Sequence, residues 1–257
     1  MTPDKAWILG VLYGDAHHDV KNGRLILESG YKRTDWEFLT LWRQKLEKVY
    51  GIKCTEWRRG GRVTGYLLTS RAASNDIIKY LPSSGTYTWH VPKAIIEGSN
   101  EIQQEFLRAF FDSEAFIDKT GITVKSVNEE GLRDILQLLS TQGITSKVTG
   151  PHYEYQKKCP TCGKRMSMGR TFCGFCGSKR LKKVLRKFYL LRIGGYRNVI
   201  TYAEKVGFNL TRKKKALRVL VKRKRRFIID PNWRKAEILR AIAEGAKSCM
   251  EIAEKPI

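Results

Sequence analysis

The sequence predicts an α+β fold made of two similar halves, in which helices alternate with antiparallel strands. Two observations support this class. Segments with helical and with strand-like patterns recur in the same order in both parts of the chain, as an internal duplication would produce. The hydrophobic share of 42% over 257 residues is also enough for one such unit with a sizeable core and a short tail.

Three short matches mark the repeat. In the first half a strand opens with Gly-Ile at 51–52, a Tyr-Leu-Leu run lies at 66–68, and a helix begins with asparagine at 75–80. The second half repeats these features in the same order at 143–144, 189–191 and 198–202. Each half is therefore expected to contain an apolar helix, a strand, a helix, a two-stranded hairpin and a further helix.

The individual elements follow from local periodicity and turn residues. Strands are expected at 24–28, 52–58, 63–69, 122–127, 144–155 and 184–193. Helices are expected at 35–50, 72–80, 129–142, 198–206 and 212–224, besides the apolar helix that opens each half. The halves differ mainly at the tip of the second hairpin, where the chain is much longer.

An apolar helix ends with a carboxylate in each half, at Asp15 in the first and at Glu114 in the second. The C-terminus of a helix carries the negative end of its dipole and several unpaired carbonyls, so an anion there is unfavourable. A cation is therefore expected beside each acid. Magnesium would suit the position, since it takes carboxylate, carbonyl, water and phosphate oxygens as ligands.

Small residues four apart mark the same two helices. Gly10 and Gly14 share one face of the first, and Ala109 and Ser113 share one face of the second. Packing these faces together would bring the two C-terminal acids side by side, where a bound metal would relieve their repulsion. The alternative is that both are ordinary buried helices with an acid at the solvent edge.

These segments resemble the paired signature of the LAGLIDADG homing endonucleases, in their single-chain form with two copies. The resemblance covers about residues 5–225. Asp15 and Glu114 fall at the eighth position of the motif, where the family keeps its metal-binding catalytic acid. The resemblance implies a pseudo-twofold α+β saddle of two αββαββα halves, whose antiparallel sheets line a DNA major groove. It also implies Mg²⁺ at the two acids, with the carbonyls of Gly14 and Ser113 as further ligands.

The sequence departs from the family pattern at two positions of the motif. Tyr13 replaces the acid expected at the sixth position of the first copy, whereas Asp112 keeps it in the second. Ala16 and Ala115 replace the final glycine of the two copies. The end of each helix is therefore the least determined part of the resemblance.

The tip of the second hairpin holds two Cys-x-x-Cys pairs, each followed by glycine and formed by Cys159, Cys162, Cys173 and Cys176. Four thiolates on two tight turns are what a structural, tetrahedral zinc ion requires, so the segment 158–178 is expected to be a zinc-binding insert. Two disulfides would need an oxidising compartment, and the N-terminus does not resemble a signal peptide. The insert could extend a DNA-binding surface or act only as a staple. Cys54 and Cys249 are expected to be small core residues.

Positive charge is concentrated in one stretch of the chain. Residues 157–226 hold 24 of the 49 lysines and arginines but one of the 25 acidic residues. Such an excess indicates a polyanionic partner, bound in a salt-dependent manner, although a basic run can also be a solvated face. Candidate DNA-binding residues are Lys53, Thr55, Trp57, Lys125, Lys147 and Arg192 on the sheets, Arg58, Arg59 and Arg62 on the first hairpin, and Lys157, Lys158 and Arg170 near the insert.

A cation beside the metals would help to neutralise the charge that develops on the attacked phosphate. The resembled family keeps basic residues at the start of the helix after the last strand. Lys213 and Lys93 occupy plausible positions for this role.

The expected domains are a first half at 1–98, a second half at 99–226 interrupted by the insert, and a helical tail at 227–257. The tail could be part of a helix-turn-helix or two helices packed on the core. With no signal peptide and no apolar run of membrane-spanning length, a cytoplasmic location without membrane contact is expected.

Together these features predict a monomeric, intron-encoded, magnesium-dependent endonuclease that makes a double-strand break at a long, lopsided DNA site. Two alternatives stay open. One is the same scaffold without cleavage, acting as a maturase on intron RNA or as a DNA-binding regulator. The other is a zinc-containing protein whose basic face binds ribosomal or transfer RNA.

Overall fold

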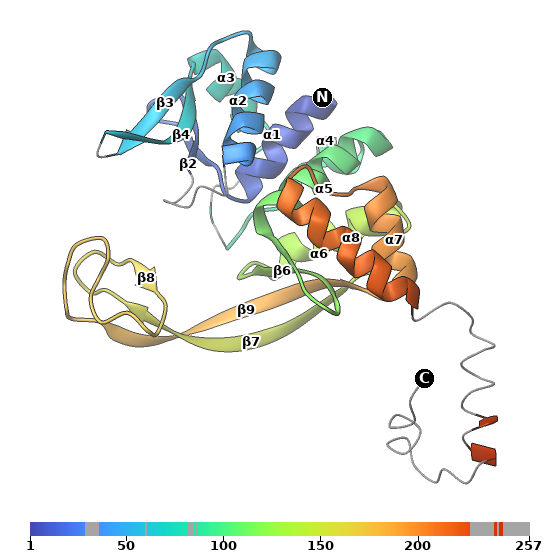
Figure 1. Ribbon diagram of the computed structural model, residues 1–257. Coiled ribbons are helices and arrows are strands. Elements are labelled where there is room, and N and C mark those ends of the chain that lie inside the picture. The colour runs from blue at the N-terminus through green and yellow to red at the C-terminus, as the bar shows by residue number, and fades with distance from the viewer. Residues whose placement is uncertain are drawn as a thin grey trace.

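The computed structural model describes residues 1–28, 36–59, 61–81, 85, 87–226, 239–240 and 242–243. It confirms the predicted α+β class: helices pack against two antiparallel sheets (Figure 1). The first half contains α1 (Pro3–Tyr13), β1 (His17–Asp19), β2 (Arg24–Glu28), α2 (Trp36–Tyr50), β3 (Thr55–Arg59), β4 (Arg62–Thr69) and α3 (Arg71–Ile78). A short helix, α4 (Lys93–Ile96), follows.

The second half repeats this order of elements. It contains α5 (Asn100–Glu114), β5 (Ala115–Ile117), β6 (Gly121–Ser126), α6 (Glu129–Thr141), β7 (Lys147–Lys158), β8 (Arg165–Met166), β9 (Lys182–Gly194), α7 (Tyr196–Lys205) and α8 (Thr211–Arg226). The first sheet has the strand order β1-β2-β4-β3, and the second has β5-β6-β9-β7-β8. Apart from β8, the two sheets therefore share one topology.

Within residues 1–226, each helix and strand expected from the sequence is present. Strand β2 has the expected bounds, and most of the others have shifted ends. The strand expected from residue 52 begins only at Thr55. Gly51 leaves α2 with a positive φ of 67°, and the Cys54 N–H donates to Glu47 Oε1 at 3.0 Å. This segment is therefore tied back to the preceding helix and not to a neighbouring strand. Cys54 is half-buried against the core, as expected.

Side-chain caps fix where four of the helices begin. The helices are α1, α3, α5 and α6, and the residues whose side-chain oxygens accept a backbone N–H of the first turn are Thr2, Ser70, Ser99 and Asn128.

The two central helices, α1 and α5, pack closely through their small residues. A Cβ atom added to Gly10 would lie 2.4 Å from the carbonyl oxygen of Phe106 and 2.8 Å from Cβ of Ala109. A Cβ atom on Gly14 would lie 2.4 Å from Cβ of Ser113. The expected helix–helix contact is therefore present, and it joins the two halves.

One face of each sheet packs on the helices, and the other is open. In the first sheet Leu25 pairs with Leu68, and both are fully buried in the core. In the second sheet Val124 pairs with Leu191 in the same way. Successive side chains of a strand point to opposite faces, so the neighbours of these residues lie on the open face.

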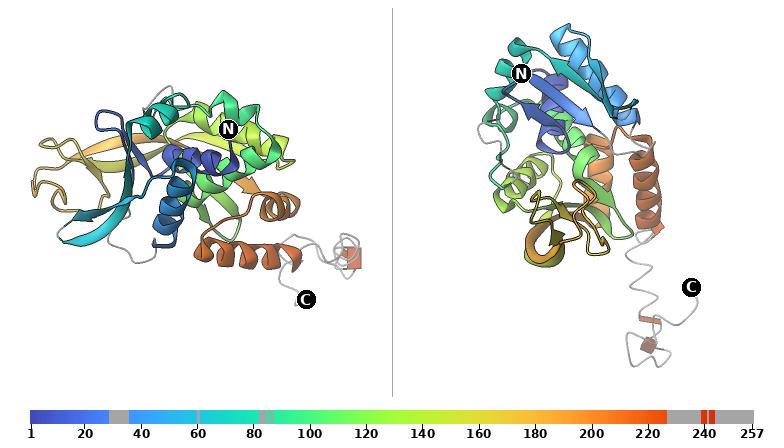
Figure 2. Two further views of the ribbon diagram at one scale, coloured as in Figure 1. Left: turned by 90° about the horizontal axis from the view of Figure 1, so that it is seen from above. Right: turned by 90° about the vertical axis from the view of Figure 1, so that its left-hand side faces the viewer.

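The β7–β9 hairpin extends beyond the helices and carries the cysteine-containing insert at its tip (Figure 1). The β3–β4 hairpin projects from the same side of the molecule (Figure 2). No helix in the described residues is long and apolar enough to cross a membrane. The expected tail at 227–257, with Cys249 and its possible helix-turn-helix, lies outside the described residues, except 239–240 and 242–243.

Candidate functional site

The two motif acids come together where α1 and α5 end. Asp15 lies in the turn after α1, and Glu114 is the last residue of α5. A Cβ atom on Gly14 would lie 3.5 Å from Cγ of Glu114, so the Glu114 side chain reaches the end of the other helix. The close packing of the two helices therefore sets the spacing of the acids.

The electrostatics of Glu114 are those of a crowded acid. Burial raises its pKa to about 7, and the negative charge of Asp15 acts in the same direction. The positive charges of Lys213 and Arg186 partly oppose this rise. Without a further cation, Glu114 therefore keeps its proton to a higher pH than an exposed glutamate does.

Lys213 lies beside this pair, as its position after the last strand suggested. Its side chain is buried, and its Nζ donates to the carbonyl oxygens of Phe111 at 2.8 Å and Asp112 at 2.7 Å. Burial lowers its pKa to about 8, against the attraction of Asp112, Asp15 and Glu114. Lys213 thus satisfies free carbonyls at the end of α5 and places a positive charge next to the acids.

Lys93 does not share this position. It opens α4, its side chain is 84% exposed, and its Nζ lies 3.5 Å from Oε1 of Glu97 in the next turn. The expectation that Lys93 would accompany the acids is therefore corrected: the structure places Arg186 there instead.

Arg186 is a site residue that the sequence analysis missed. It lies on β9, opposite Glu154 of β7, and its Nη1 is 3.7 Å from Oε1 of Glu154. It has the same parity on β9 as Arg192, which was predicted to face the DNA. Extending that alternation by six residues would have placed Arg186 on the same face.

The sixth-position residues of the two motifs have equivalent structural roles. The carboxylate of Asp112 accepts the N–H groups of Asn209 at 2.8 Å and Leu210 at 3.4 Å, just after α7. Tyr13 instead donates its hydroxyl to the carbonyl of Tyr80, just after α3, at 2.9 Å. An acceptor facing N–H groups has thus been exchanged for a donor facing a carbonyl. This explains why Tyr13 fits where an acid was expected.

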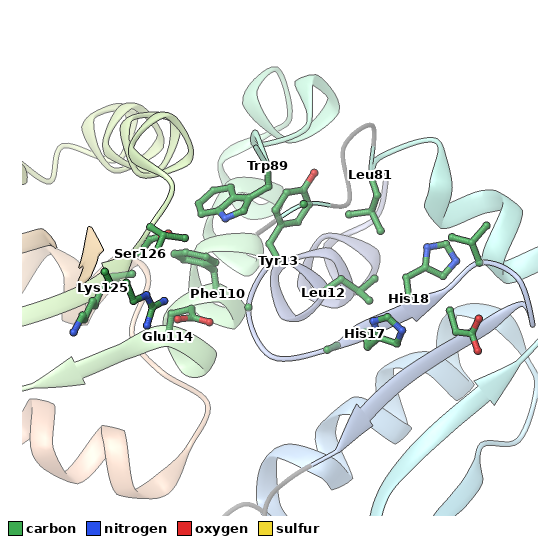
Figure 3. Close-up of a pocket in the computed structure, with 18 residues that line it drawn as sticks. Leu12, Tyr13, His17, His18, Leu81, Trp89, Phe110, Glu114, Lys125 and Ser126 are labelled. Atoms are coloured by element: carbon green, nitrogen blue, oxygen red, sulfur yellow. The ribbon is translucent and has the colours of Figure 1, made fainter. Parts of the chain in front are cut away.

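A cavity of about 640 Å³ lies between the two halves beside Glu114. Figure 3 shows Glu114 and Lys125 from the second half and His17 and His18 from the first around it. His18 is held by Ser74, whose Oγ lies 2.8 Å from its Nε2, while His17 is exposed. Both histidines thus lie on β1, facing this cavity.

The four cysteines form a compact cluster. Their Sγ atoms all lie within 4.8 Å of one another, with 3.6 Å between Cys159 and Cys176 and 3.5 Å between Cys162 and Cys173. A tetrahedral Zn–S₄ site has sulfur atoms about 3.8 Å apart, whereas a disulfide joins them at about 2.05 Å. The donor set therefore fits one zinc ion and does not form disulfides.

Two similar backbone turns hold these thiols. The backbone carbonyl of Cys159 accepts the N–H of Gly163 at 2.8 Å, and the backbone carbonyl of Cys173 accepts the N–H of Gly177 at the same distance. Both glycines have positive φ, 71° and 73°, which explains why glycine follows each pair.

The predicted DNA-binding residues of the first half divide between two faces. Thr55 pairs with Leu67 and Trp57 with Gly65, on the open face. Arg58 follows a register shift and forms an ion pair with Glu56, on the other face. Lys53 lies before β3, and its Nζ is 3.6 Å from Oε2 of Glu47. Arg62 is exposed at the start of β4. The side chain of Arg59 is not among those that the structure describes.

Those of the second half also divide. Lys125, Lys147 and Arg192 lie on the open face of the second sheet, and Lys158 continues that face at the hairpin tip. Lys157 points to the other face and donates to the carbonyl of Arg170 at 2.7 Å. Lys157 therefore ties the insert to the hairpin, and Arg170 is an exposed part of the insert.

A divalent cation is expected to bind the acids in a pH-dependent manner. Because the pKa of Glu114 is raised to about 7, binding below that pH must displace a proton. The apparent affinity for Ca²⁺, measured by calorimetry, should fall by up to about tenfold per pH unit below 7 and level off above it. Glu114→Gln should bind more weakly with no such slope, and a pH-independent wild-type affinity would contradict the assignment.

About one zinc ion per chain is expected in elemental analysis, because four thiolates satisfy its tetrahedral preference. Cys159→Ser should lose this metal and make the insert sensitive to proteolysis. Cys54→Ser is the matched control and should keep the zinc, since Cys54 contacts the carbonyl of Arg43 and not the cluster. Wild-type protein that is stable without metal would exclude a structural zinc site.

Comparisons with known proteins agree with this geometry. Residues 101–207 match the model of a LAGLIDADG-like domain, which confirms the resemblance in the second half. The structure of I-DmoI in complex with DNA and Ca has a TM-score of 0.52 at 13% identity, covering 84% of this chain and 97% of that one. A structure of mesophilic variants of the homing endonuclease I-DmoI has a TM-score of 0.50 at 13% identity, covering 80% and 95%. At such identity, the likeness shows a shared fold.

A curated relative is the replication factor C small subunit of Methanocaldococcus jannaschii, 24% identical over 215 residues. The alignment covers 83% of this chain but 10% of that protein, so the chain spans about a tenth of its relative's length.

Proposed function

We propose that the chain is a site-specific, magnesium-dependent endonuclease of the homing type, which makes a double-strand break in DNA. One observation carries the proposal: a carboxylate from each half reaches the same point at the ends of α1 and α5, where the two are electrostatically coupled. Two similar active centres, one per strand, are what a double-strand break requires. In this proposal the two sheets form a pseudo-twofold saddle over the duplex.

The residues at this point fit magnesium. Asp15 and Glu114 would supply carboxylate oxygens, and Gly14 and Ser113 would supply backbone carbonyls, all of which are hard ligands. The raised pKa of Glu114 is also what an acid without its cation shows. When bound, magnesium makes water a stronger nucleophile and stabilises the leaving oxygen.

The remaining groups act on the charge of the substrate. Lys213 uses two of its three N–H donors on the carbonyls of Phe111 and Asp112, so its ammonium group is held in one place beside the acids. Arg186 faces the central cavity together with Glu114. Fixed positive groups at this position would bind the scissile phosphate and stabilise the negative charge of the transition state.

The open faces of the sheets supply the binding surface. Thr55 and Trp57 in the first half, with Lys125, Lys147 and Arg192 in the second, lie where they could reach the edges of bases in a major groove. Residues 157–226, which include the insert, hold 24 of the 49 lysines and arginines, and they belong to the second half alone. We therefore propose a monomer that binds a long, lopsided duplex site.

The test is to present the purified chain with a library of duplexes and Mg²⁺ and to sequence the ends of the products. A single long recognition site, cut on both strands, is expected. A footprint in Ca²⁺ should extend further on the Glu114 side of the cut than on the Asp15 side, because the basic insert lies in that half.

Deleting residues 158–178 and closing the hairpin with two glycines should shorten the long flank. The slope of the logarithm of the DNA-binding constant against the logarithm of the salt concentration should become shallower by about 0.9 for each phosphate contact that is lost. A symmetric footprint would contradict the proposed role of the insert. A preference for structured RNA over all duplexes, without cleavage, would support the maturase instead.

A further inference from the structure

A second cleft, of about 550 Å³, lies between the insert and the open face of the β7–β9 hairpin. The insert folds back here, because β8 pairs with the end of β7 and sets Arg165 opposite Lys158. Gln156 and Arg186 line the cleft from the hairpin, and Ser167 lines it from the insert. In Figure 1 β8 and the insert lie at the left end of the molecule, on the side of the β7–β9 hairpin that faces the first half.

The lining of the cleft suits an anion, apart from one hydrogen-bond acceptor, the side-chain oxygen of Gln156. Three of its lining residues are cationic, namely Lys158, Arg165 and Arg186, and none of the lining residues that the structure describes is acidic. The Nε of Arg186 is buried without a hydrogen-bond partner, so this side chain has a donor that the described protein atoms do not use. Arginine donors in a fork geometry suit the oxygens of a phosphate.

Gln156 adds a hydrogen-bond acceptor to this cationic cleft. The side-chain oxygen of Gln156 is also buried without a partner, while its nitrogen donates to Oε1 of Glu154 at 3.0 Å. A phosphodiester group has no hydrogen-bond donor, so a backbone phosphate alone would not pair with that oxygen. A nucleotide carries both a phosphate and, in adenine and cytosine, an exocyclic amine that can donate to it.

The cleft is continuous with the central site. Arg186 and Val127 line both this cleft and the cavity that contains Glu114. A strand that leaves the central cavity past Arg186 would therefore enter the cleft directly. The position of Arg165 also depends on the cysteine cluster, because the N–H of Cys159 donates to the carbonyl of the preceding residue, Lys164, at 2.9 Å.

From these contacts we infer that the cleft is a nucleotide-binding subsite for one DNA strand. Lys158 and Arg165 bind a backbone phosphate on the Glu114 side, beyond the scissile phosphate at Arg186, and Gln156 accepts a hydrogen bond from a base amine. The subsite is complete only when the cysteine cluster holds its metal. The inference rests on the proposed function for the identity of the strand, but its test does not require cleavage.

The experiment is phosphate-ethylation interference on a duplex selected for binding to the full-length protein in Ca²⁺. With wild-type protein, one or two adjacent phosphates beyond the Glu114-side cut should be sensitive. Arg165→Gln should remove that sensitivity and lower the salt slope by about 0.9. Arg180→Gln is the matched control, an exposed arginine near the insert that does not line the cleft, and it should change neither.

Two further measurements sharpen the result. Removing zinc with a chelator should erase the same phosphate signal in wild-type protein and leave Arg165→Gln unchanged. Gln156→Leu should keep the phosphate signal but lose the preference for one base pair next to it. Equal effects of Arg165→Gln and Arg180→Gln would overturn the subsite, since they would indicate general attraction by charge.

The outcomes also separate this inference from the proposed function. Cleavage at a defined site with unchanged interference in Arg165→Gln would overturn the subsite and leave the endonuclease standing. Local, Arg165-dependent interference on a duplex that is never cut would support the subsite and overturn the endonuclease.

Discussion

Asp15→Asn or Glu114→Gln should lower the rate of DNA cleavage by about 10³-fold or more, while folding and Ca²⁺-supported DNA binding are kept. Each substitution is close to isosteric and removes one charge from the point where the two central helices end. The metal would lose a carboxylate ligand, and rate losses of this size follow when a group needed mainly in the transition state is removed. The measurement is single-turnover cleavage of the selected site in Mg²⁺.

Glu114→Gln should not lower the stability of the metal-free protein at pH 8, whereas loss of a structural acid would lower it. The folded-state pKa of Glu114 is raised to about 7, so the folded chain holds this proton more tightly than the unfolded chain. Without metal, the contribution of Glu114 to stability therefore falls as pH rises from its unfolded pKa through about 7. Glu114→Gln removes this loss and should melt at the same or a higher temperature than wild type at pH 8.

The control for both measurements is Glu97→Gln. Glu97 is exposed at the end of α4 and pairs with Lys93, away from the central cavity, so its loss should leave cleavage and melting unchanged. If Asp15→Asn and Glu114→Gln unfolded the protein and abolished binding together, the acids would be structural and the proposed chemistry would be wrong.

The parts of the site that depend on local spacing could be predicted from the sequence. Gly10 and Gly14 lie four residues apart, so they must share a helix face wherever that helix packs. The cysteine cluster could be predicted for the same reason, because each Cys-x-x-Cys pair and the glycine after it form one local turn.

The parts that depend on strand register could not be predicted. A register shift between Thr149 and His152 inserts one extra residue in β7 relative to β9, so the parity of β7 changes at this point. One irregular residue reverses every side chain beyond it. Gly150 and Pro151 mark an irregularity at this point of the sequence, but they do not give the register of the strand beyond it. Lys157 has the same parity as Lys147 but points to the other face because of this shift. Arg186 lies on β9, which is regular, so its parity with Arg192 could have revealed it.

Very short strands and contacts between distant helices could not be predicted from the sequence either. Strand β1 consists of His17, His18 and Asp19, which have no strand-like pattern, and it exists because it pairs with β2. Lys93 and Lys213 were equivalent candidates by position in the sequence. The buried contacts of Lys213 with the end of α5 distinguish them, and such contacts depend on how helices pack.

Gly10→Ala should destabilise the protein by about 1–3 kcal/mol, although the same change in an exposed helix stabilises it by about 0.5–1 kcal/mol. The added Cβ would lie 2.4 Å from the carbonyl oxygen of Phe106, an atom of the α5 backbone that no rotamer change can move. The two helices would have to separate, and the acids at their ends would separate with them. Chemical denaturation should show the loss, and cleavage should fall as well.

Gly14→Ala offers an internal comparison, because its Cβ would meet the side chain of Ser113 at 2.4 Å rather than backbone. The double variant with Ser113→Gly should therefore recover part of the lost stability, whereas combining Gly10→Ala with Ala109→Gly should recover little. Gly194→Ala, with no atom within 4 Å of its added Cβ and no positive φ, is the control and should be nearly neutral. Wild-type stability in Gly10→Ala would mean that α1 and α5 do not approach this closely, and the two acids would then lose the contact on which the proposed site depends.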